Sequence, residues 1–229
     1  MAAALFVLTS GFVAPVLRPT ESPTRHAAVI ARDLAFVASL EVATEPFAVS
    51  RPLGEWFQQE EALQILMSQA EATRRLDGGD ARATAQQWEV TTPIQFPGMV
   101  VRSDTPMDIA IDTSTPRLSI SSGESKTVCE GGPPWAQSLL ARIGEIAKTE
   151  SSNVIEVSEA GSSSKVVSKV KLEVKLSIPT VLLPPFVPAG PFERTGSASL
   201  QQLLDKDMGP VLSRFRHGYL AWAAKEAKV

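Results

Sequence analysis

The segment from Val166 to Ile178 constrains the fold more than any other part of the chain. Apolar residues alternate there with charged or small polar residues along the whole segment. Because successive side chains of a strand point to opposite faces, one face is apolar and the other carries Lys169, Lys171 and Lys175. This pattern predicts a long strand of an antiparallel sheet with one covered face. The segment Asn153–Ser158 is its predicted hairpin partner, joined through residues 161–164.

A long apolar stripe near the C-terminus predicts the element that covers this face. From Ser199 onward, apolar residues recur every three or four positions, which is the spacing of one helix face. Ser199 and Gln202 form a capping box at its start. Pro210 lies inside the pattern, so we expect a kink or a restart of the helix there. The stripe consists of Leu200, Leu204, Met208, Val211, Phe215, Tyr219 and Trp222.

The remaining segments predict one more long strand, two helices and a run of short strands. Residues 34–42 alternate as a strand, and residues 54–76 have the spacing of a helix. Between residues 86 and 129, short alternating segments separated by turns favour an antiparallel meander. A second amphipathic helix is expected over residues 135–148.

The order of these elements predicts the fold class. A sheet must cover its apolar face, and the C-terminal helix is the one predicted element long enough to do so. We therefore expect a single α+β domain over residues 33–229, in which an antiparallel sheet wraps around a long C-terminal helix. This order is similar to the helix-grip fold of START-like lipid-transfer domains and polyketide cyclases.

Residues 1–32 differ in character from the rest of the chain. They begin with a short apolar stretch, continue through Gly11-Phe-Val-Ala-Pro15, and end in a basic segment that contains Ser and Thr and a single acid, Glu21. This arrangement resembles the bipartite presequences of algae with complex plastids, although no basic residue precedes the apolar stretch. It predicts a plastid (chloroplast) protein; the alternative is a disordered tail without a targeting role.

Composition limits the classes of partner. The net charge of −3 gives no general cationic field for nucleic acid, and we expect no nucleic-acid partner. No apolar run approaches the ~20 residues that span a bilayer, so we expect no transmembrane segment, although peripheral membrane contact stays open. A single cysteine, Cys129, allows no disulfide within the chain.

The C-terminal third carries a recognisable combination of segments. A strand ends at Pro179, an apolar proline-rich connector follows, and then come Glu193-Arg-Thr-Gly196, Pro210-Val-Leu-Ser-Arg-Phe215 and Tyr219-Leu-Ala-Trp222. Together with Glu45-Pro-Phe47 and Phe96-Pro-Gly-Met-Val100, this resembles the cyanobacterial and plastid family called domain of unknown function nineteen-ninety-seven. The resemblance covers residues 34–224. It implies a photosynthetic lineage and no particular reaction.

The aromatic and methionine side chains indicate where a ligand would bind. A helix-grip sheet can leave a cavity beneath its helix, and Met and Phe suit apolar ligands. The alternative is that these side chains simply fill the core, because protein interiors are normally close-packed. The candidate cavity residues are Phe96, Met99, Met107, Phe186, Phe192, Phe215 and Trp222.

No catalytic or metal-binding constellation is predicted. Cys129 has no histidine nearby that would activate a thiol, and His217 is expected on the solvated face of the terminal helix. Asp104, Asp108 and Asp112 share one strand face, but the alternation around Met107 makes that face the outer one. We therefore predict no metal site, and no cofactor is indicated.

Two functions follow from these patterns, and a third is weaker. The first is a non-enzymatic plastid protein that binds a lipid, a pigment or another apolar molecule beneath the helix. The second is an interaction or assembly subunit of a photosynthetic or other plastid complex, docking through the apolar connector Val181–Phe192. The third is a cyclase-like enzyme, for which the sequence shows no buried acid–base pair.

Overall fold

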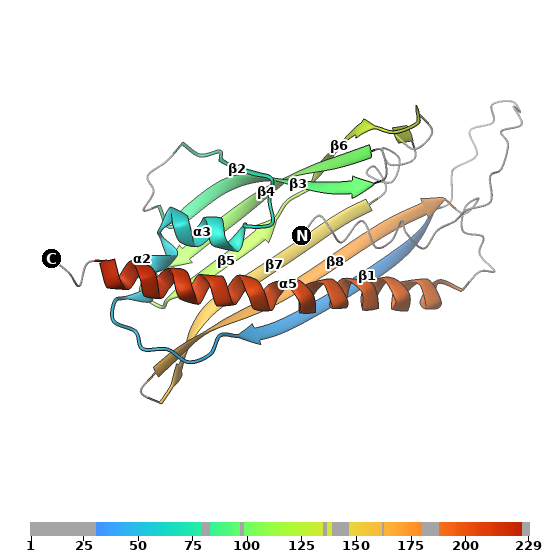
Figure 1. Ribbon diagram of the computed structural model, residues 1–229. Coiled ribbons are helices and arrows are strands. Elements are labelled where there is room, and N and C mark those ends of the chain that lie inside the picture. Colours follow the sequence, from blue (N-terminus) through green and yellow to red (C-terminus); the bar gives the residue numbers. More distant parts are fainter. Residues whose placement is uncertain are drawn as a thin grey trace, which may run out of the picture.

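The computed structural model describes residues 31–78, 83–96, 99–134, 137–138, 147–161, 163–179 and 188–225. The chain forms one strand, then two short helices, then a run of strands, and ends in one long helix (Figure 1). The strands are β1 (Ala31–Ala43), β2 (Ala72–Arg75), β3 (Ala85–Phe96), β4 (Met99–Asp112), β5 (Arg117–Ser122), β6 (Lys126–Gly131), β7 (Ala147–Ala160) and β8 (Ser163–Pro179). The helices are α2 (Leu53–Phe57), α3 (Glu60–Leu66) and α5 (Ala189–Lys225).

All strands join one antiparallel sheet in the order β1-β8-β7-β5-β4-β3-β2, and β6 pairs with β4. The chain leaves β1 at one edge, passes through α2 and α3, and re-enters at the opposite edge through β2. From there the strands follow in sequence back toward β1, and α5 closes the chain. An antiparallel sheet of this order with a long C-terminal helix is the helix-grip fold, so the predicted fold class is confirmed.

The sheet divides between β6 and β7. The strand β6 pairs with β4 alone, and β7 pairs with β5 only from Ser152 to Glu156. Among the described residues, the first residues of β7 therefore have no partner strand on the side that faces β6.

Helix α5 covers the edge strand β1 with side chains of regular spacing. The backbone N–H groups of Ala35, Val37 and Ser39 donate to Glu193 Oε1, Ser197 Oγ and Gln201 Oε1, at 3.2, 3.1 and 3.3 Å. Two residues of a strand span about 6.7 Å and four residues of a helix about 6 Å, so the two series stay in register. An open edge invites pairing with another chain, and α5 blocks it here.

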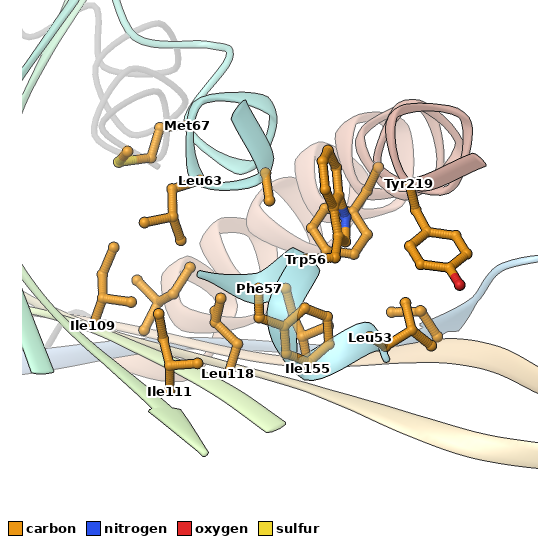
Figure 2. Close-up of a cluster of buried hydrophobic side chains, with 14 of the residues drawn as sticks. Leu53, Trp56, Phe57, Leu63, Met67, Ile109, Ile111, Leu118, Ile155 and Tyr219 are labelled. Atoms are coloured by element: carbon orange, nitrogen blue, oxygen red, sulfur yellow. The ribbon is translucent and has the colours of Figure 1, made fainter. Parts of the chain in front are cut away.

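Two separate apolar clusters hold the helix to the sheet. One contains Leu200 and Leu204 of α5 against Leu34 and Phe36 of β1 and the inner side chains of β8. The other joins the C-terminal half of α5 to α2, α3 and the inner face of β3, β4, β5 and β7 (Figure 2). The second cluster includes Leu53, Trp56, Phe57, Leu63, Met67, Ile109, Ile111, Leu118, Ile155 and Tyr219.

The structure corrects two element predictions. The prediction of one helix over residues 54–76 is wrong. This segment forms two short helices followed by strand β2, because the chain turns at Gln58–Gln59 and so packs both Trp56 and Leu63 inward. Helix α5 begins at Ala189 rather than Ser199 and continues through Pro210, whose side chain is exposed. Residues 135–136 and 139–146 of the helix expected over 135–148 lie outside the described part, and β7 begins at Ala147.

Candidate ligand-binding face of the sheet

The inner face of the sheet carries a band of small uncharged polar side chains between the two apolar clusters. We call this band the polar patch. It consists of Thr92 of β3, Ser103 and Thr105 of β4, Ser122 of β5, Ser125, Thr127 of β6, Thr149, Ser151 and Asn153 of β7, and Ser168 of β8.

The strand registers place these residues on one face. Ser103 lies directly opposite Thr92 on one neighbouring strand and Thr127 on the other. Residues that pair directly in an antiparallel sheet point to the same side, with Cβ atoms about 5 Å apart. The inward position of Ser103 is fixed by Val101 and Met107 on the same strand, which are both buried. This part of the polar patch is therefore continuous across β3, β4 and β6.

Part of the patch is satisfied by its own hydrogen bonds. Ser122 Oγ and Ser151 Oγ lie 2.7 Å apart, and Thr105 Oγ1 and Ser125 Oγ lie 2.8 Å apart. The Ser168 hydroxyl, which is fully buried, donates to Asn153 Oδ1 at 2.7 Å. These pairs join neighbouring strands on the inner face of the sheet.

Other polar atoms of the patch have no such partner. Ser103 is 7% exposed, and its hydroxyl makes no hydrogen bond to another described residue; Asn153 is 9% exposed, and no described residue accepts from its Nδ2. Some polar atoms, such as Trp56 Nε1, are fully buried and have no hydrogen-bond partner. The Ser103 hydroxyl and Asn153 Nδ2 differ from these atoms, because they keep some contact with solvent. Both residues are therefore largely buried, while their polar atoms are not sealed from accessible space.

The residues predicted to line a cavity fall into separate places. Met107 lies opposite Ser122, at the border between the polar patch and the larger apolar cluster. Phe215 and Trp222 belong to that same cluster, and Phe192 packs against the other one. The side chains of Phe96, Met99 and Phe186 lie outside the described residues. Their contact with a ligand stays a prediction.

Sequence reasoning did not find the polar patch, although its signal was present. The alternation of β4 was interpreted through Met107, Ile109 and Ile111, while Ser103 and Thr105 continue the same face. Isolated Ser and Thr residues are common in strands and turns, so each alone gives no signal. Only the pairing of β3, β4, β5, β6 and β7 brings them together.

An aromatic cluster closes the end of the molecule near α2. Trp56 packs against Phe215, Tyr219 and Trp222, with ring centroids 5.8, 6.4 and 5.7 Å apart. The Arg51 guanidinium carbon lies 3.7 Å from the centre of the Trp222 ring, a cation–π contact. The Tyr219 hydroxyl accepts from the Arg51 N–H at 3.1 Å and donates to the Arg51 carbonyl oxygen at 2.7 Å. These contacts fix the segment before α2 to α5.

The acidic residues of β4 and His217, which the sequence placed on outward faces, lie away from the core. Asp104, Asp108 and Asp112 lie on the outer face of β4 and accept hydrogen bonds from Thr91, Gln87 and Ser114. His217 is exposed, with Nδ1 2.7 Å from the Ser213 carbonyl oxygen. The outer placement of these side chains is confirmed. No group of three or more His, Cys, Asp or Glu residues with metal-binding geometry occurs within the described ranges.

Cys129 lies on β6 opposite Val101, beside the polar patch. Burial raises the pKa of the Cys129 thiol above its usual range. A nucleophilic cysteine requires the opposite shift, because the thiolate is the reactive form. This direction agrees with the sequence, in which no histidine lies near Cys129 to activate its thiol.

Several charged residues gather at one end of the sheet, on its outer face and on α5 beside it. A groove of about 420 Å³ lies at the end of β1, β8 and β7. Its acids are already engaged: Asp33 accepts from Ser177 Oγ at 2.6 Å, and Glu193 accepts from the N–H of Ala35. Lys175 lies 3.2 Å from Glu173. The groove is lined by Asp33, Leu34, Ala35, Lys148, Lys175, Ser177 and Glu193.

A second charged group, also on the outer face, stabilises β4 and β6. Arg102 pairs with Glu71 at 3.0 Å and with Glu130. The hydrogen bonds that Arg102 donates to these two carboxylates raise the pKa of Arg102 further above its usual range. The charge stays on the side of the sheet away from the polar patch. Separately, none of the helices in the described part of the chain is long and apolar enough to cross a membrane.

Comparison with known proteins gives similarity in fold only. No protein-family model matches the chain, and no curated protein matches it. A crystal structure of a protein from Thermus thermophilus aligns with a TM-score of 0.47 and 14% identity, over 81% of this chain and 97% of that one. The Zhui aromatase/cyclase from Streptomyces sp. R1128 aligns with a TM-score of 0.43 and 9% identity, over 79% and 94%.

Norcoclaurine synthase from Thalictrum flavum aligns with a TM-score of 0.34 and 16% identity, over 82% of this chain and 98% of that one. Identities and TM-scores of this size say nothing about which ligand or reaction belongs to the chain. The helix-grip assignment therefore rests on the strand order, the registers and the position of α5.

Proposed function

We propose that this protein is a non-enzymatic binding module that holds a small, largely apolar molecule, such as a lipid or a pigment, between the sheet and α5. The observation that carries the proposal is the polar patch on the inner face of the sheet, with its two largely buried residues. Ser103 and Asn153 are buried, yet their polar atoms reach accessible space, and apolar clusters lie on both sides of them. A concave, mostly apolar site with a few polar groups is the usual form of a ligand pocket.

The residues around the polar patch support binding rather than catalysis. The inner-facing positions of β3, β4, β5 and β6 carry no Asp, Glu, Lys, Arg or His. General acid–base catalysis needs a titratable group within hydrogen-bond reach of the reacting atom. The one thiol beside the patch, Cys129, has a raised pKa. Positioning of a bound molecule is the role that these side chains can perform.

Titration with the uncharged dye Nile red tests this function. We expect saturable binding of one dye per protein, measured by its fluorescence and checked by native mass spectrometry of the complex. Thr127 is half-buried and lies directly opposite Ser103, so Thr127→Trp should cover the polar patch and abolish saturable binding. Val128 is 52% exposed on the other face of β6, so Val128→Trp is the matched control and should bind normally.

Two outcomes would overturn the proposal. One is a wild-type protein that binds no dye. The other is equal loss of binding in Thr127→Trp and Val128→Trp while both proteins keep the wild-type unfolding curve. Far-UV circular dichroism of both variants separates loss of the binding site from loss of the fold.

The location in a plastid and the resemblance to the family of unknown function nineteen-ninety-seven belong to the same proposal. They are supported by the Gly11-Phe-Val-Ala-Pro15 segment and by the C-terminal segments described above. Fusion of residues 1–32 to a fluorescent protein in a diatom tests the location, with Phe12→Ala as the variant expected to block plastid import. The role as an interaction or assembly subunit stays a prediction, because residues 181–187 of the connector lie outside the described part.

A further inference from the structure

We infer that the outer edge of β1 is a self-association surface, which the N-terminal half of α5, residues 189–208, keeps covered. When this half of the helix lifts away, β1 pairs with β1 of a second copy of the chain. The inference does not depend on the proposed ligand. It is carried by the composition of β1, by the contacts that cover its edge, and by the way the two halves of α5 are held.

Strand β1 has the composition of a strand that pairs readily with another chain. It is 13 residues long, and its middle, residues 34–40, contains no charged residue, no proline and no glycine. Leu34 and Phe36 are buried on the inner face, while Val37 on the outer face is 44% exposed. A long, uncharged edge strand with apolar residues on both faces is prone to pair with a further strand.

The opposite edge of the sheet is protected by its own sequence. Strand β2 has four residues, two of which are Arg74 and Arg75. Its neighbour β3 carries Pro93 beyond the residues with which β2 pairs. Short edge strands, charged side chains and proline are common means of preventing association at an edge. Residues 34–40 of β1 have no charge and no proline, so the protection of this edge depends on α5.

Three side chains of α5 take the place of a neighbouring strand. Glu193, Ser197 and Gln201 accept the N–H groups of every second residue of β1, from Ala35 to Ser39. A partner strand would offer a backbone carbonyl oxygen to each of the same N–H groups. The edge can therefore exchange α5 for another strand without leaving these donors unpaired.

The two halves of α5 are held by separate apolar clusters, and the helix is weakest where they meet. Leu200 and Leu204 hold the N-terminal half to β1 and β8, whereas Phe215 and Tyr219 hold the C-terminal half within the aromatic cluster. Gly209–Pro210 lies between the two sets. Proline donates no N–H to the helix, and glycine has a low helix propensity. The N-terminal half can therefore lift while the aromatic cluster keeps the C-terminal half in place.

The middle of β1 is complementary to itself in antiparallel pairing, which makes a second copy its partner. Pairing about a two-fold axis at Phe36 places Leu34 of one copy opposite Ala38 of the other, so only uncharged residues meet at the centre. Asp33 then faces Ser39, and no two acids oppose each other. A two-fold contact uses the same surface on both copies and closes as a dimer.

A variant without the three acceptors tests the inference. Glu193→Ala, Ser197→Ala and Gln201→Ala together give the uncapped variant, in which alanine keeps the helix because it has the highest helix propensity. At roughly two- to tenfold for each bond, their loss favours the lifted form by roughly tenfold or more. Both copies must lift before β1 pairs with β1, so the dimerisation constant should strengthen by the square of this factor, roughly a hundredfold or more. Sedimentation velocity of the full chain over a range of concentrations measures this change against the wild type.

Matched controls assign the effect to the edge of β1. Arg194→Ala, Gln202→Ala and Lys206→Ala together change three exposed side chains of the same helix and should leave the dimerisation constant at the wild-type value. In the uncapped variant, the further change Val37→Lys should restore the monomer, because the two introduced ammonium groups lie diagonally on one face and repel each other. Val49 is similarly exposed, at 41%, but lies outside the strands, so Val49→Lys should leave the dimer intact.

Two outcomes overturn the inference. One is an uncapped variant that stays monomeric at every concentration, and the other is a dimer that persists after Val37→Lys. Tryptophan fluorescence shows whether the aromatic cluster stays folded in each variant. If the uncapped variant unfolds, the double variant Ser197→Ala and Gln201→Ala keeps the Glu193 bond and takes its place, with an expected strengthening of roughly tenfold or more. The same two outcomes then decide.

Discussion

Removal of the Tyr219 hydroxyl tests how strongly the aromatic cluster fixes α5 to the rest of the molecule. The Tyr219 ring is fully buried against Phe47, Trp56 and Trp222. Its hydroxyl accepts from the Arg51 N–H at 3.1 Å and donates to the Arg51 carbonyl oxygen at 2.7 Å. Tyr219→Phe removes both hydrogen bonds and keeps the ring, so no cavity of side-chain size is created.

The magnitude follows from the two lost bonds. A net contribution of about 1 kcal/mol for each hydrogen bond gives a loss of about 2 kcal/mol in the free energy of unfolding. The loss is slightly larger if water does not reach the partly buried backbone groups of Arg51 after the change. For a domain of this size, 1 kcal/mol lowers the unfolding midpoint by about 2–4 °C, so we expect a decrease of about 4–8 °C.

Urea unfolding followed by tryptophan fluorescence measures the change. The urea midpoint should fall while the slope of the transition stays constant, because the surface exposed on unfolding is the same. Ser177→Ala is the comparison, since it deletes an exposed hydroxyl that donates to Asp33, and it should cost less than about 0.5 kcal/mol. A Tyr219→Phe variant within about 0.5 kcal/mol of the wild type would refute the claim that this contact anchors α5.

Three further changes test separate parts of the structure. Gly218→Ala places a Cβ 3.0 Å from the buried Trp56 ring, so we expect a net destabilisation of about 1–2 kcal/mol in urea unfolding, despite the better helix propensity of alanine. Ser197→Ala removes the acceptor of the Val37 N–H, and hydrogen exchange of that amide, followed by NMR, should become several-fold faster. Because burial raises the pKa of the Cys129 thiol, iodoacetamide should modify it more slowly at pH 8 in the folded than in the urea-unfolded protein, as measured by mass spectrometry.

Each of these predictions has an internal control. The atom closest to the added Cβ of residue 218 is Ile65 Cδ1 at 2.7 Å, and Ile65→Val removes that methyl group, so the double variant should recover part of the loss. In Ser197→Ala, the amides of Ala35 and Ser39 keep their own acceptors and should exchange as before. Equal changes at all three amides, or an alkylation rate that does not depend on folding, would contradict the respective interpretation.

The alternation and turn signals of the sequence determined most of the sheet. The strand Val166–Ile178 corresponds to β8, and its predicted partner 153–158 lies within β7. A period of two over so many residues is typical of a strand and does not suit a helix, because a helix would place both residue types on every face. The strand at residues 34–42 and the apolar stripe of the C-terminal helix were recognised in the same way.

The helix limits were not determined by local pattern. Residues 54–76 have helical spacing, but the chain there turns at Gln58–Gln59 and forms β2 at Ala72–Arg75, because Trp56, Phe57 and Leu63 can all be buried only if the helix is divided. Residues 189–198 contain Gly190 and Pro191, which oppose helix formation in isolation. They are helical because Glu193 and Ser197 hydrogen-bond to the edge of β1.

The candidate site was also determined partly by the sequence and partly by the tertiary structure. The sequence by itself determined that one sheet face is apolar, that charges lie on the other face, and that a long helix is available to cover the sheet. Only the tertiary structure decided that Thr92, Ser103 and Thr127 lie side by side on the inner face, because they come from three strands and their proximity depends on pairing register. It also decided that α5 lies along β1 rather than over the middle of the sheet, since the unpaired N–H groups of an edge strand attract its polar side chains.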